Sequence, residues 1–415
     1  MNKTDKFNLK KTSSVDFLCL SLLILYPVAL ILGNLFINFF TLLFSIGFFY
    51  NLKERKKYLN QKIFYLFIFF FISLLINLIF STNPANSFPR IIKVLFIMFF
   101  IFETQRIVQN YEASHMRYVY GSWFAIFIII TIDIIFETVF GYNLIGMESY
   151  MPGRVVSFFG DELIVGAFYH GFVLFFLSYL ILRGTKNNIL ILTIILVLLA
   201  SFIIGERSNF IRLFLSVLIF TTFVLKINYK IKIVTLLFIT TIIITFINFN
   251  QNFKTRYFEQ IKTVFTIDGY SKFMKESQYG AHRDVAVKIL KDNLFFGVGV
   301  KNFRHESLKD KYENKEYLQT HKRYATHPHQ VHHEMLSETG FFGYLSFLIF
   351  FLLSIALAIN NYLKIGNIYQ LSGIIYVIIS LVPMLPSGSF LSTYSGGIFW
   401  LNFAIMCAYI KKIKF

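Results

Sequence analysis

Long apolar runs separated by short polar segments make up most of the chain. A helix needs about 20 apolar residues to cross the hydrocarbon core of a bilayer. The pattern predicts twelve such helices, over residues 14–33, 34–51, 62–80, 90–109, 118–138, 162–182, 187–204, 208–226, 232–249, 340–360, 368–385 and 389–410. We therefore expect an all-α, polytopic integral membrane protein.

Basic residues favour one side of this predicted arrangement. If the N-terminus is cytoplasmic, the segments that face the cytoplasm hold half of the 40 Lys and Arg residues. The short segments on the opposite side hold only Arg90, Arg154 and Arg207. Because Lys and Arg concentrate in cytoplasmic segments of membrane proteins, the bias favours twelve helices with both termini in the cytoplasm.

One hydrophilic segment, residues 250–338, separates the ninth and tenth predicted helices and holds seven of the nine histidines. It is too long for a simple connection. Its stretches DVAVKILKDNLF and SLKDKYENKEYL predict short amphipathic helices. The chain thus divides into helices one to nine (1–249), a large external loop (250–338) and helices ten to twelve (339–415), with the functional site expected in the loop.

The composition supports the membrane assignment and limits the alternatives. The chain is 56% hydrophobic with 53 Phe, which is more apolar surface than a soluble domain can bury. The net charge of +18 follows largely from topology signals at helix ends, so we expect no nucleic-acid partner. Cys19 and Cys407 lie in apolar runs and indicate neither a disulfide framework nor a thiolate metal site. The first run lacks a clear cleavage site and is interpreted as a retained helix.

Arginines next to apolar runs are the first candidates for a functional site. Arg207 lies in the short GERSNF segment before the eighth predicted helix, and Arg212 lies inside that helix. A charge at membrane depth is costly and usually faces a cavity or a partner. Guanidinium groups match phosphate oxygens in a bidentate geometry, which suggests a phosphate clamp. The alternative is that Glu206 neutralises Arg207 while Arg212 snorkels outward.

The external loop adds another arginine and two glycines. Arg283 in GAHRDVAVKIL opens a predicted amphipathic helix, where pairing with Asp284 is the simpler alternative. Gly297 and Gly299 in NLFFGVGVKNFR allow a tight turn and a close approach of the backbone to a substrate. A plain turn explains these glycines as well, and no strand–helix unit surrounds them to suggest a dinucleotide site.

Four histidines, at 327, 329, 332 and 333, fall within seven residues of THPHQVHHEMLSETGFFGYL, just before the tenth predicted helix. Pro328 should hold His327 extended. A helix is then predicted to begin near His329, which would lie in its first turn. The positive end of a helix disfavours imidazolium, so this ring would stay neutral and suit a general base.

Two other interpretations of the histidine cluster remain open at this stage. His329 and His333 are four residues apart and would share a helical face, a spacing that zinc sites use. No HExxH motif accompanies them, and solvated interface histidines without a function fit the pattern too. Glu338 would orient one of the rings or cap the turn at Gly340.

Acidic residues at the outer end of the sixth predicted helix complete the set. Asp161, followed by Glu162, lies on the same predicted side as Arg207 and Arg283. These carboxylates would accept hydrogen bonds from sugar hydroxyls or pair with the arginines.

Three stretches resemble motifs of the bacterial O-antigen ligase/polymerase superfamily. GERSNFIRLFL is similar to an arginine motif before a transmembrane helix, and HRDVAVKILKDNLFFGVGVKNFR to a motif of the external loop. THPHQVHHEMLSETGFFG is similar to the histidine signature at the end of that loop, and PSGSFLSTYSGGIFW to the stretch before the last helix. The number of helices and the loop between the ninth and tenth fit as well.

The resemblance implies a lipid-dependent, GT-C-like glycosyltransferase in the bacterial inner membrane, with its active site in the periplasm. Such an enzyme takes a glycan from undecaprenyl pyrophosphate and, in the ligases, attaches it to lipid A–core or another glycolipid. Inversion without a metal or other cofactor is implied. Arg207 and Arg283 fall on the family's arginines, and His329 falls on its histidine. Gln330 stands where Asn is usual.

The expected site therefore has Arg207, Arg283 and His329 as catalytic residues and a further substrate-binding set: Arg212, Asp161, Gly297, Gly299, Glu338 and His327. Three alternatives to a ligase stay open: a polymerase that joins lipid-linked repeat units, a transporter or flippase for an anionic lipid, and a metal-binding membrane protein. A transporter would be expected to show broken helices at the membrane midplane, whereas here the ionisable residues gather at one face.

Overall fold

The computed structural model describes residues 14–50, 62–111, 113–160, 163–225, 228–249, 251, 254–259, 266–383 and 385–410. Within these residues the regular elements are helices, and the only β pairing is an isolated bridge between Tyr142 and Glu148. The predicted all-α class is confirmed.

Each predicted membrane span coincides with a helix of the structure. The bounds are α1 Ser14–Leu32, α2 Asn34–Tyr50, α4 Lys62–Ile79, α5 Pro84–Asn110, α6 Ala113–Phe140, α7 Val165–Leu182, α8 Asn187–Ile203, α9 Arg207–Val224, α10 Tyr229–Phe249, α16 Val331–Ile365, α17 Ile368–Ser380 and α18 Thr393–Ala408. Six of the described helices, namely α1, α4, α6, α7, α9 and α16, are both long and apolar enough to cross a membrane. Twelve crossings therefore stay a prediction.

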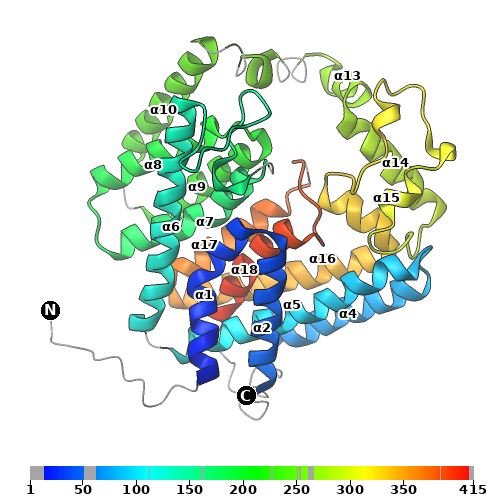
Figure 1. The fold of residues 1–415 in the computed structure, drawn as a ribbon, viewed down its shortest axis with the longest axis horizontal. Helices are drawn as coiled ribbons and strands as arrows, with labels where there is room; N and C mark the ends of the chain where they lie inside the picture. Colours follow the sequence, from blue (N-terminus) through cyan, green and yellow to red (C-terminus); the bar gives the residue numbers. More distant parts are fainter. Residues whose placement is uncertain are drawn as a thin grey trace.

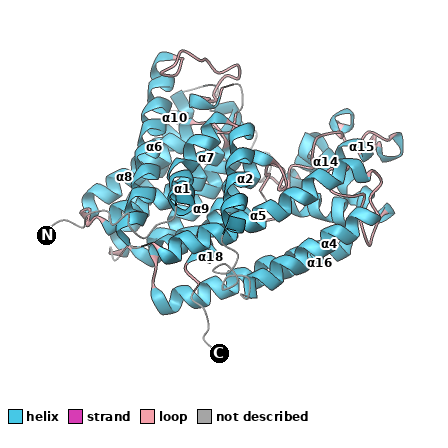
Figure 2. Cartoon of the chain, turned by 60° about the horizontal axis from the view of Figure 1, so that its bottom comes forward, coloured by secondary structure: helices cyan, strands magenta, loops and turns pink. Residues whose placement is uncertain are grey.

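Aromatic packing holds the helices together. The long helix α16 runs along α4, α18 packs against α5 and α17, and α2 packs between α1 and α5 (Figures 1 and 2). Between α4 and α16 the rings of Phe70 and Phe350 stack with centroids 5.6 Å apart. Large apolar side chains also cover the outside of the bundle, as at Leu35 and Ile79, which are 76% and 77% exposed. Such a surface is stable when lipid is the solvent.

The connections predicted to face outward meet at one end of the bundle. Thr82, which precedes α5, donates its N–H to the Val298 carbonyl in the large loop at 3.0 Å. Val155, which precedes α7, donates to the Ile204 carbonyl at 3.2 Å. The structure thus brings the predicted outer loops together, as the charge bias implied; which face of the membrane they occupy stays a prediction.

The described part of the large loop contains α13 Gly269–Glu276, α14 Gln278–Asp292 and the short α15 Phe303–Glu306. The predicted amphipathic helix at DVAVKILKDNLF is part of α14, whose Val285 and Ile289 pack in a small core with Phe303 and Tyr312. Figure 2 shows α14 and α15 over one end of α4 and α16.

The second predicted helix of the loop, at SLKDKYENKEYL, is wrong. Only a 3₁₀ turn forms there, η5 Asp310–Tyr312. Asn314 accepts the N–H of Glu316 through its side chain and donates its own N–H to the Thr320 hydroxyl at 3.0 Å. Local side-chain hydrogen bonds of this kind compete with helical ones, and they turn the chain here.

The large loop is joined to the membrane helices at a kink in α16. Gly340 has φ 66° and ψ −171°, which interrupts the helix and frees the next N–H groups. Phe341 and Phe342 donate these groups to the carbonyls of Leu294 and Phe295 at 2.8 and 3.1 Å. We call the paired segments 293–303 and 337–342 the latch.

Two buried carboxylates of α6 hold the connection from α6 to α7. Asp133 accepts the N–H of Leu144 at 2.8 Å and the hydroxyl of Ser157 at 2.6 Å. Glu137 accepts the N–H groups of Val156 and Ser157 at 3.0 and 2.7 Å. These bonds fix the segment that carries Arg154.

Candidate active site

A cavity of about 560 Å³ lies where the large loop meets the membrane helices. Its walls come from the start of α9, from α13 and α14, from residues 328–336, and from Pro383, Leu385 and Pro386. Arg207, Arg283 and His329 all line it, although 76 residues separate the two arginines in the chain. We call it the arginine–histidine cavity.

The arginines enter this cavity from different directions. Arg207 is the first residue of α9, and Arg283 lies in the second turn of α14, which begins at Gln278 rather than at Arg283 as predicted. Arg283 is exposed and donates from Nη1 to the Tyr270 hydroxyl at 3.3 Å. Arg154, which was not predicted as a site residue, contributes a third guanidinium to the wall.

Glu206 neutralises part of this charge. Its Oε1 lies 3.2 Å from Nη2 of Arg154 and accepts the N–H of Gly166 at 3.0 Å. Burial raises the pKa of Glu206, while Arg154 and the hydrogen bonds lower it. One carboxylate therefore sits among several guanidinium groups, and the cavity keeps a positive character that suits an anion.

His329 does not lie in the first turn of α16, so that prediction is wrong. The helix begins at Val331 with Gln330 as its N-cap, and the Gln330 side chain accepts the N–H of His333 at 2.7 Å. His329 precedes the cap with a left-handed φ of 53°. Its carbonyl accepts the N–H of Ser387 at 2.8 Å, which ties this conformation to the segment before α18.

Three imidazoles pack against one another at this point. The ring centroid of His329 lies 4.2 Å from that of His327 and 5.1 Å from that of His282. Burial and the neighbouring His327 lower the pKa of His329 to about 4. Burial likewise lowers the pKa of His282 and of His327 to about 4. The predicted neutral ring is thus present, but its cause is burial rather than the helix end.

A second cavity of about 350 Å³ adjoins the first. The two share His329, Arg154 and Tyr279 among their lining residues. The second cavity adds His327, and also Arg212, which is only 6% exposed and donates to the Leu385 carbonyl at 3.1 Å. Arg212 therefore points into the protein instead of snorkelling outward. His329 stands between the two spaces.

Three predicted substrate-binding residues lie in the latch and outside both cavities. A Cβ at Gly297 would come within 2.5 Å of the Glu338 backbone, and one at Gly299 within 2.0 Å of the Ser81 hydroxyl. Glu338 is buried and accepts the N–H of Lys301 at 2.8 Å. These residues allow backbones to pack closely, so a role in substrate binding has no geometric support for them. Asp161 lies outside the described residues.

The zinc interpretation loses its geometric basis. Because the helix starts after His329, this residue and His333 do not share a helical face. His332 contacts the Tyr344 hydroxyl at 2.9 Å and the Leu381 carbonyl at 2.7 Å. Among the described residues, no group of three His, Cys, Asp or Glu side chains is arranged to hold a metal ion.

Three residues of this site were not predicted from the sequence: Arg154, Tyr279 and His282. A signal for Arg154 was present, since it is one of three arginines that break the charge bias on the predicted outer side. His282 lies next to Arg283 in the sequence, but its stacking on His329 depends on how α14 folds back on the histidine segment.

The comparison with known families agrees with this geometry. A model of the O-antigen ligase family matches residues 171–348, from α7 to the first turns of α16 beyond the kink. This segment of the chain is similar to the O-antigen ligase family. The predicted resemblance is confirmed, and no curated protein matches the chain.

The matched O-antigen ligase segment contains Arg207, Arg283 and His329 together with the latch. The match supports a membrane enzyme of ligase or polymerase type. In this chain the cavity walls also use residues outside the matched segment, such as Arg154 and Pro386.

Proposed function

We propose that this protein is an O-antigen ligase that transfers a glycan from undecaprenyl pyrophosphate to a hydroxyl of lipid A–core or another glycolipid, at the periplasmic face of the inner membrane. The observation that carries the proposal is the meeting of Arg207, Arg283 and His329 in one cavity at the boundary of the loop and the membrane helices. The chemistry below follows from their side chains.

The arginines suit the leaving group. As the glycosidic C–O bond breaks, negative charge grows on the pyrophosphate oxygens, and preplaced cations stabilise the transition state more than the bound substrate. Guanidinium stays charged at physiological pH and donates in a fork that matches phosphate oxygens. Arg207 and Arg283 therefore bind the donor and assist departure of the pyrophosphate.

His329 suits the acceptor. The acceptor hydroxyl oxygen attacks the anomeric carbon, the bond from this carbon to the pyrophosphate oxygen breaks, and the hydroxyl proton passes to the neutral imidazole. A single displacement of this kind inverts the anomeric configuration. It uses no cofactor and no metal ion, in line with a GT-C-like enzyme.

The bound donor also makes His329 a better base. A pKa of about 4 keeps the ring neutral but weakly basic. A pyrophosphate held by Arg207 and Arg283 brings negative charge beside the ring, and a nearby anion raises the pKa of an imidazole. Donor binding thereby moves His329 towards the range in which general bases are efficient.

The cavity also has an apolar side for a polyprenyl chain. Ile211 and Leu336 line it, and Ile211 is 37% exposed on the surface of α9. A lipid tail in the bilayer can therefore reach the cavity past α9 while its charged headgroup lies among the arginines.

The test is a transfer assay with purified, reconstituted protein, undecaprenyl-pyrophosphate-linked glycan and lipid A–core. We expect transfer by the wild type, and a loss of about 100-fold or more for Arg283→Ala, since one lost donor to a developing anion costs about 10²–10³ in rate. The matched control is Lys291→Ala, a change of an exposed cation on the same helix.

The products distinguish the two enzyme types. Glycan attached to lipid A–core supports a ligase, whereas longer glycan still on undecaprenyl pyrophosphate shows a polymerase. Equal rates in wild type, Arg283→Ala and Lys291→Ala would refute the proposed role of the cavity.

A further inference from the structure

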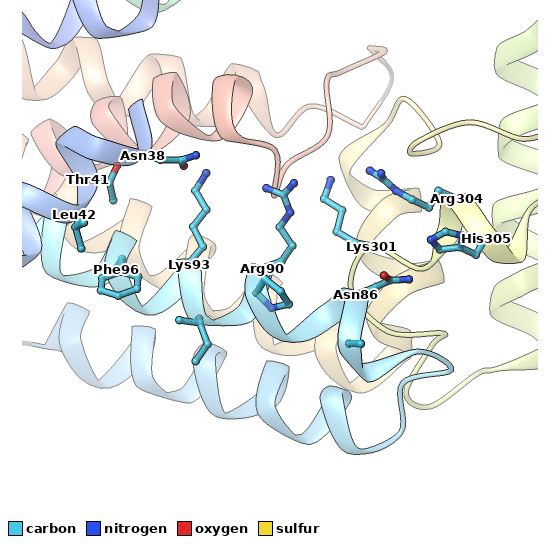
Figure 3. Close-up of a pocket in the computed structure, with 13 residues that line it drawn as sticks. Asn38, Thr41, Leu42, Asn86, Arg90, Lys93, Phe96, Lys301, Arg304 and His305 are labelled. Atoms are coloured by element: carbon cyan, nitrogen blue, oxygen red, sulfur yellow. The ribbon is translucent and has the colours of Figure 1, made fainter. Parts of the chain in front are cut away.

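A separate pocket of about 670 Å³ lies between α2, α5 and the start of α15. Four cationic side chains line it: Arg90 and Lys93 of α5, and Lys301 and Arg304 of the large loop. Figure 3 shows them in a row, with their charged ends directed towards the same space. We call it the basic pocket. It shares no lining residue with the two cavities around His329.

The positive charge of this pocket is poorly balanced within the described part of the chain. No carboxylate lines it, and the one ion pair of its cations joins Lys301 to Glu334 at 3.9 Å. Lys93 donates to the neutral Thr393 hydroxyl at 2.8 Å. The buried Nε of Arg304 has no hydrogen-bond partner among the described residues. Clustered cations repel one another, so an anion is needed to stabilise them.

Lys301 is held in an energetically unfavourable position, because its side chain is buried and its backbone is left-handed. Lys301 is 5% exposed and has a left-handed φ of 65°, a conformation that is unfavourable for a residue with a side chain. Its N–H donates to Glu338 in the latch, and its ammonium donates to Ser389. Burial and the charges of Arg90 and Arg304 lower its pKa, while Glu334 and Glu338 raise it. The ammonium is therefore fixed at the pocket and not a mobile surface group.

One of the arginines that depart from the predicted charge bias, Arg90, lines the basic pocket. Arg90, Arg154 and Arg207 are the arginines that lie on the predicted outer side in short segments, against the charge bias. Arg154 and Arg207 line the arginine–histidine cavity, and Arg90 lines the basic pocket. Each exception to the topology signal is thus part of a cavity wall.

The shape of the basic pocket fits an amphiphile. Its α5 wall runs from Asn86 to Phe96, about 15 Å along a helix at 1.5 Å per residue. Arg90, Lys301 and Arg304 lie towards the outer end, and Leu42, Ile92 and Phe96 contribute apolar surface around Lys93 further along the helix. The exposed Leu42 belongs to the outer apolar surface of α2, which places the pocket beside lipid.

From these observations we propose that the basic pocket binds the phosphate-bearing headgroup of an anionic lipid, with the phosphate among Arg90, Lys301 and Arg304 and an acyl chain along α2 and α5. This site is distinct from the arginine–histidine cavity and does not depend on the function proposed for that cavity. A soluble phosphate would satisfy the cations but not the apolar wall, so a lipid is the better fit.

The proposal is tested by native mass spectrometry of the full-length protein, released from detergent with dioleoyl phosphatidylglycerol or dioleoyl phosphatidylcholine, in the absence of glycan donor. We expect tighter binding of phosphatidylglycerol by the wild type. Arg90→Gln/Arg304→Gln should weaken it by about tenfold or more, since each cation near an anionic headgroup contributes about 1 kcal/mol. Binding of phosphatidylcholine should not change.

The matched control is Lys291→Gln/Lys315→Gln, which removes two exposed cations of the large loop that line none of the three cavities. An equal loss of phosphatidylglycerol in this control, or none in the pocket variant, overturns the proposal. Competition by inorganic phosphate at the same concentration as the lipid overturns it too, because the site would then take a soluble anion. Equal melting temperatures of both variants show that folding is intact.

Discussion

The arginine–histidine cavity and the basic pocket lie at the same end of the helix bundle and both gather cations, but different groups accompany the charge. In the first, guanidinium groups share the wall with a neutral imidazole and an apolar flank. In the second, the cations stand beside amides, a hydroxyl and one peripheral histidine, His305. The cations of the basic pocket can bind an anion. In the arginine–histidine cavity a base lies next to the cations, so a bound donor can also undergo displacement at its anomeric carbon.

The largest expected effect is on the base. His329→Ala should slow glycan transfer by about 10²- to 10⁴-fold at saturating donor, because it removes the proton acceptor. Donor binding, measured separately, should change little, since the arginines remain. The control is His321→Ala, an exposed histidine of the same loop outside the described cavities.

The pH profile sharpens this test. The folded-state pKa of His329 is about 4, so the ring is neutral above that value. The kcat/KM for the donor reports the free enzyme and should therefore fall only as the pH drops towards 4. The acid limb should be missing from the residual rate of His329→Ala. Full activity of that variant across the range would rule out the histidine as base.

A smaller but broader effect is expected at the latch. It contributes Lys301 to the basic pocket, and it directly follows α14, which carries Arg283 of the arginine–histidine cavity. Gly340 has a backbone conformation that is nearly restricted to glycine, and an added Cβ would come within 2.4 Å of the Phe295 backbone. Gly340→Ala should therefore destabilise the protein by about 3 kcal/mol or more. It should also weaken both glycan transfer and lipid binding, with faster hydrogen exchange in residues 293–303.

Gly366 provides the matched control. It ends α16 with a φ of 70°, but nothing lies within 4 Å of an added Cβ. Gly366→Ala should cost about 1 kcal/mol and leave both sites intact. Equal effects of the two substitutions would show that the latch does not couple the cavities.

The helices of this protein were predictable because lipid requires long apolar runs, and every predicted span has its helix. Arg207, Arg283 and His329 were predictable from motifs, but their meeting was not, since it depends on the fold of α14 against the histidine segment. The basic pocket escaped prediction for the same reason. Arg90 and Lys301 are far apart in sequence, and only the latch and α5 bring them together.

The local errors have a common physical origin. The predicted start of the helix, near His329, lies two residues before the observed start at Val331. Gln330 caps α16 through its side chain, a role that residues such as Ser or Asp usually have. The glycines of the large loop were assigned to a substrate, whereas Gly297 and Gly299 accommodate other parts of the protein. A sequence shows that a backbone must approach something closely, but not what it approaches.

The smallest expected effect distinguishes the two sites by their response to acid. His282 and His327 are 3% and 9% exposed, and burial lowers both pKa values to about 4, against about 6.5 in an unfolded chain. Between these values the unfolded state binds more protons, so stability is complete above about pH 6.5 and is lost as the pH falls towards 4. Arg90 and Arg304 of the basic pocket add nothing to this change, because arginine does not titrate in this range.

The melting temperature of the purified protein should therefore fall by several degrees between pH 7 and pH 5, and His282→Gln/His327→Gln should reduce that fall. His321→Gln is the control, because its ring is exposed and lines none of the three cavities. If the melting temperature falls equally in the wild type, His282→Gln/His327→Gln and His321→Gln, the acid sensitivity does not come from the histidine cluster. An acid response that disappears in His282→Gln/His327→Gln would show that burial keeps the imidazoles around His329 neutral, whereas the two arginines of the basic pocket stay charged over the same range.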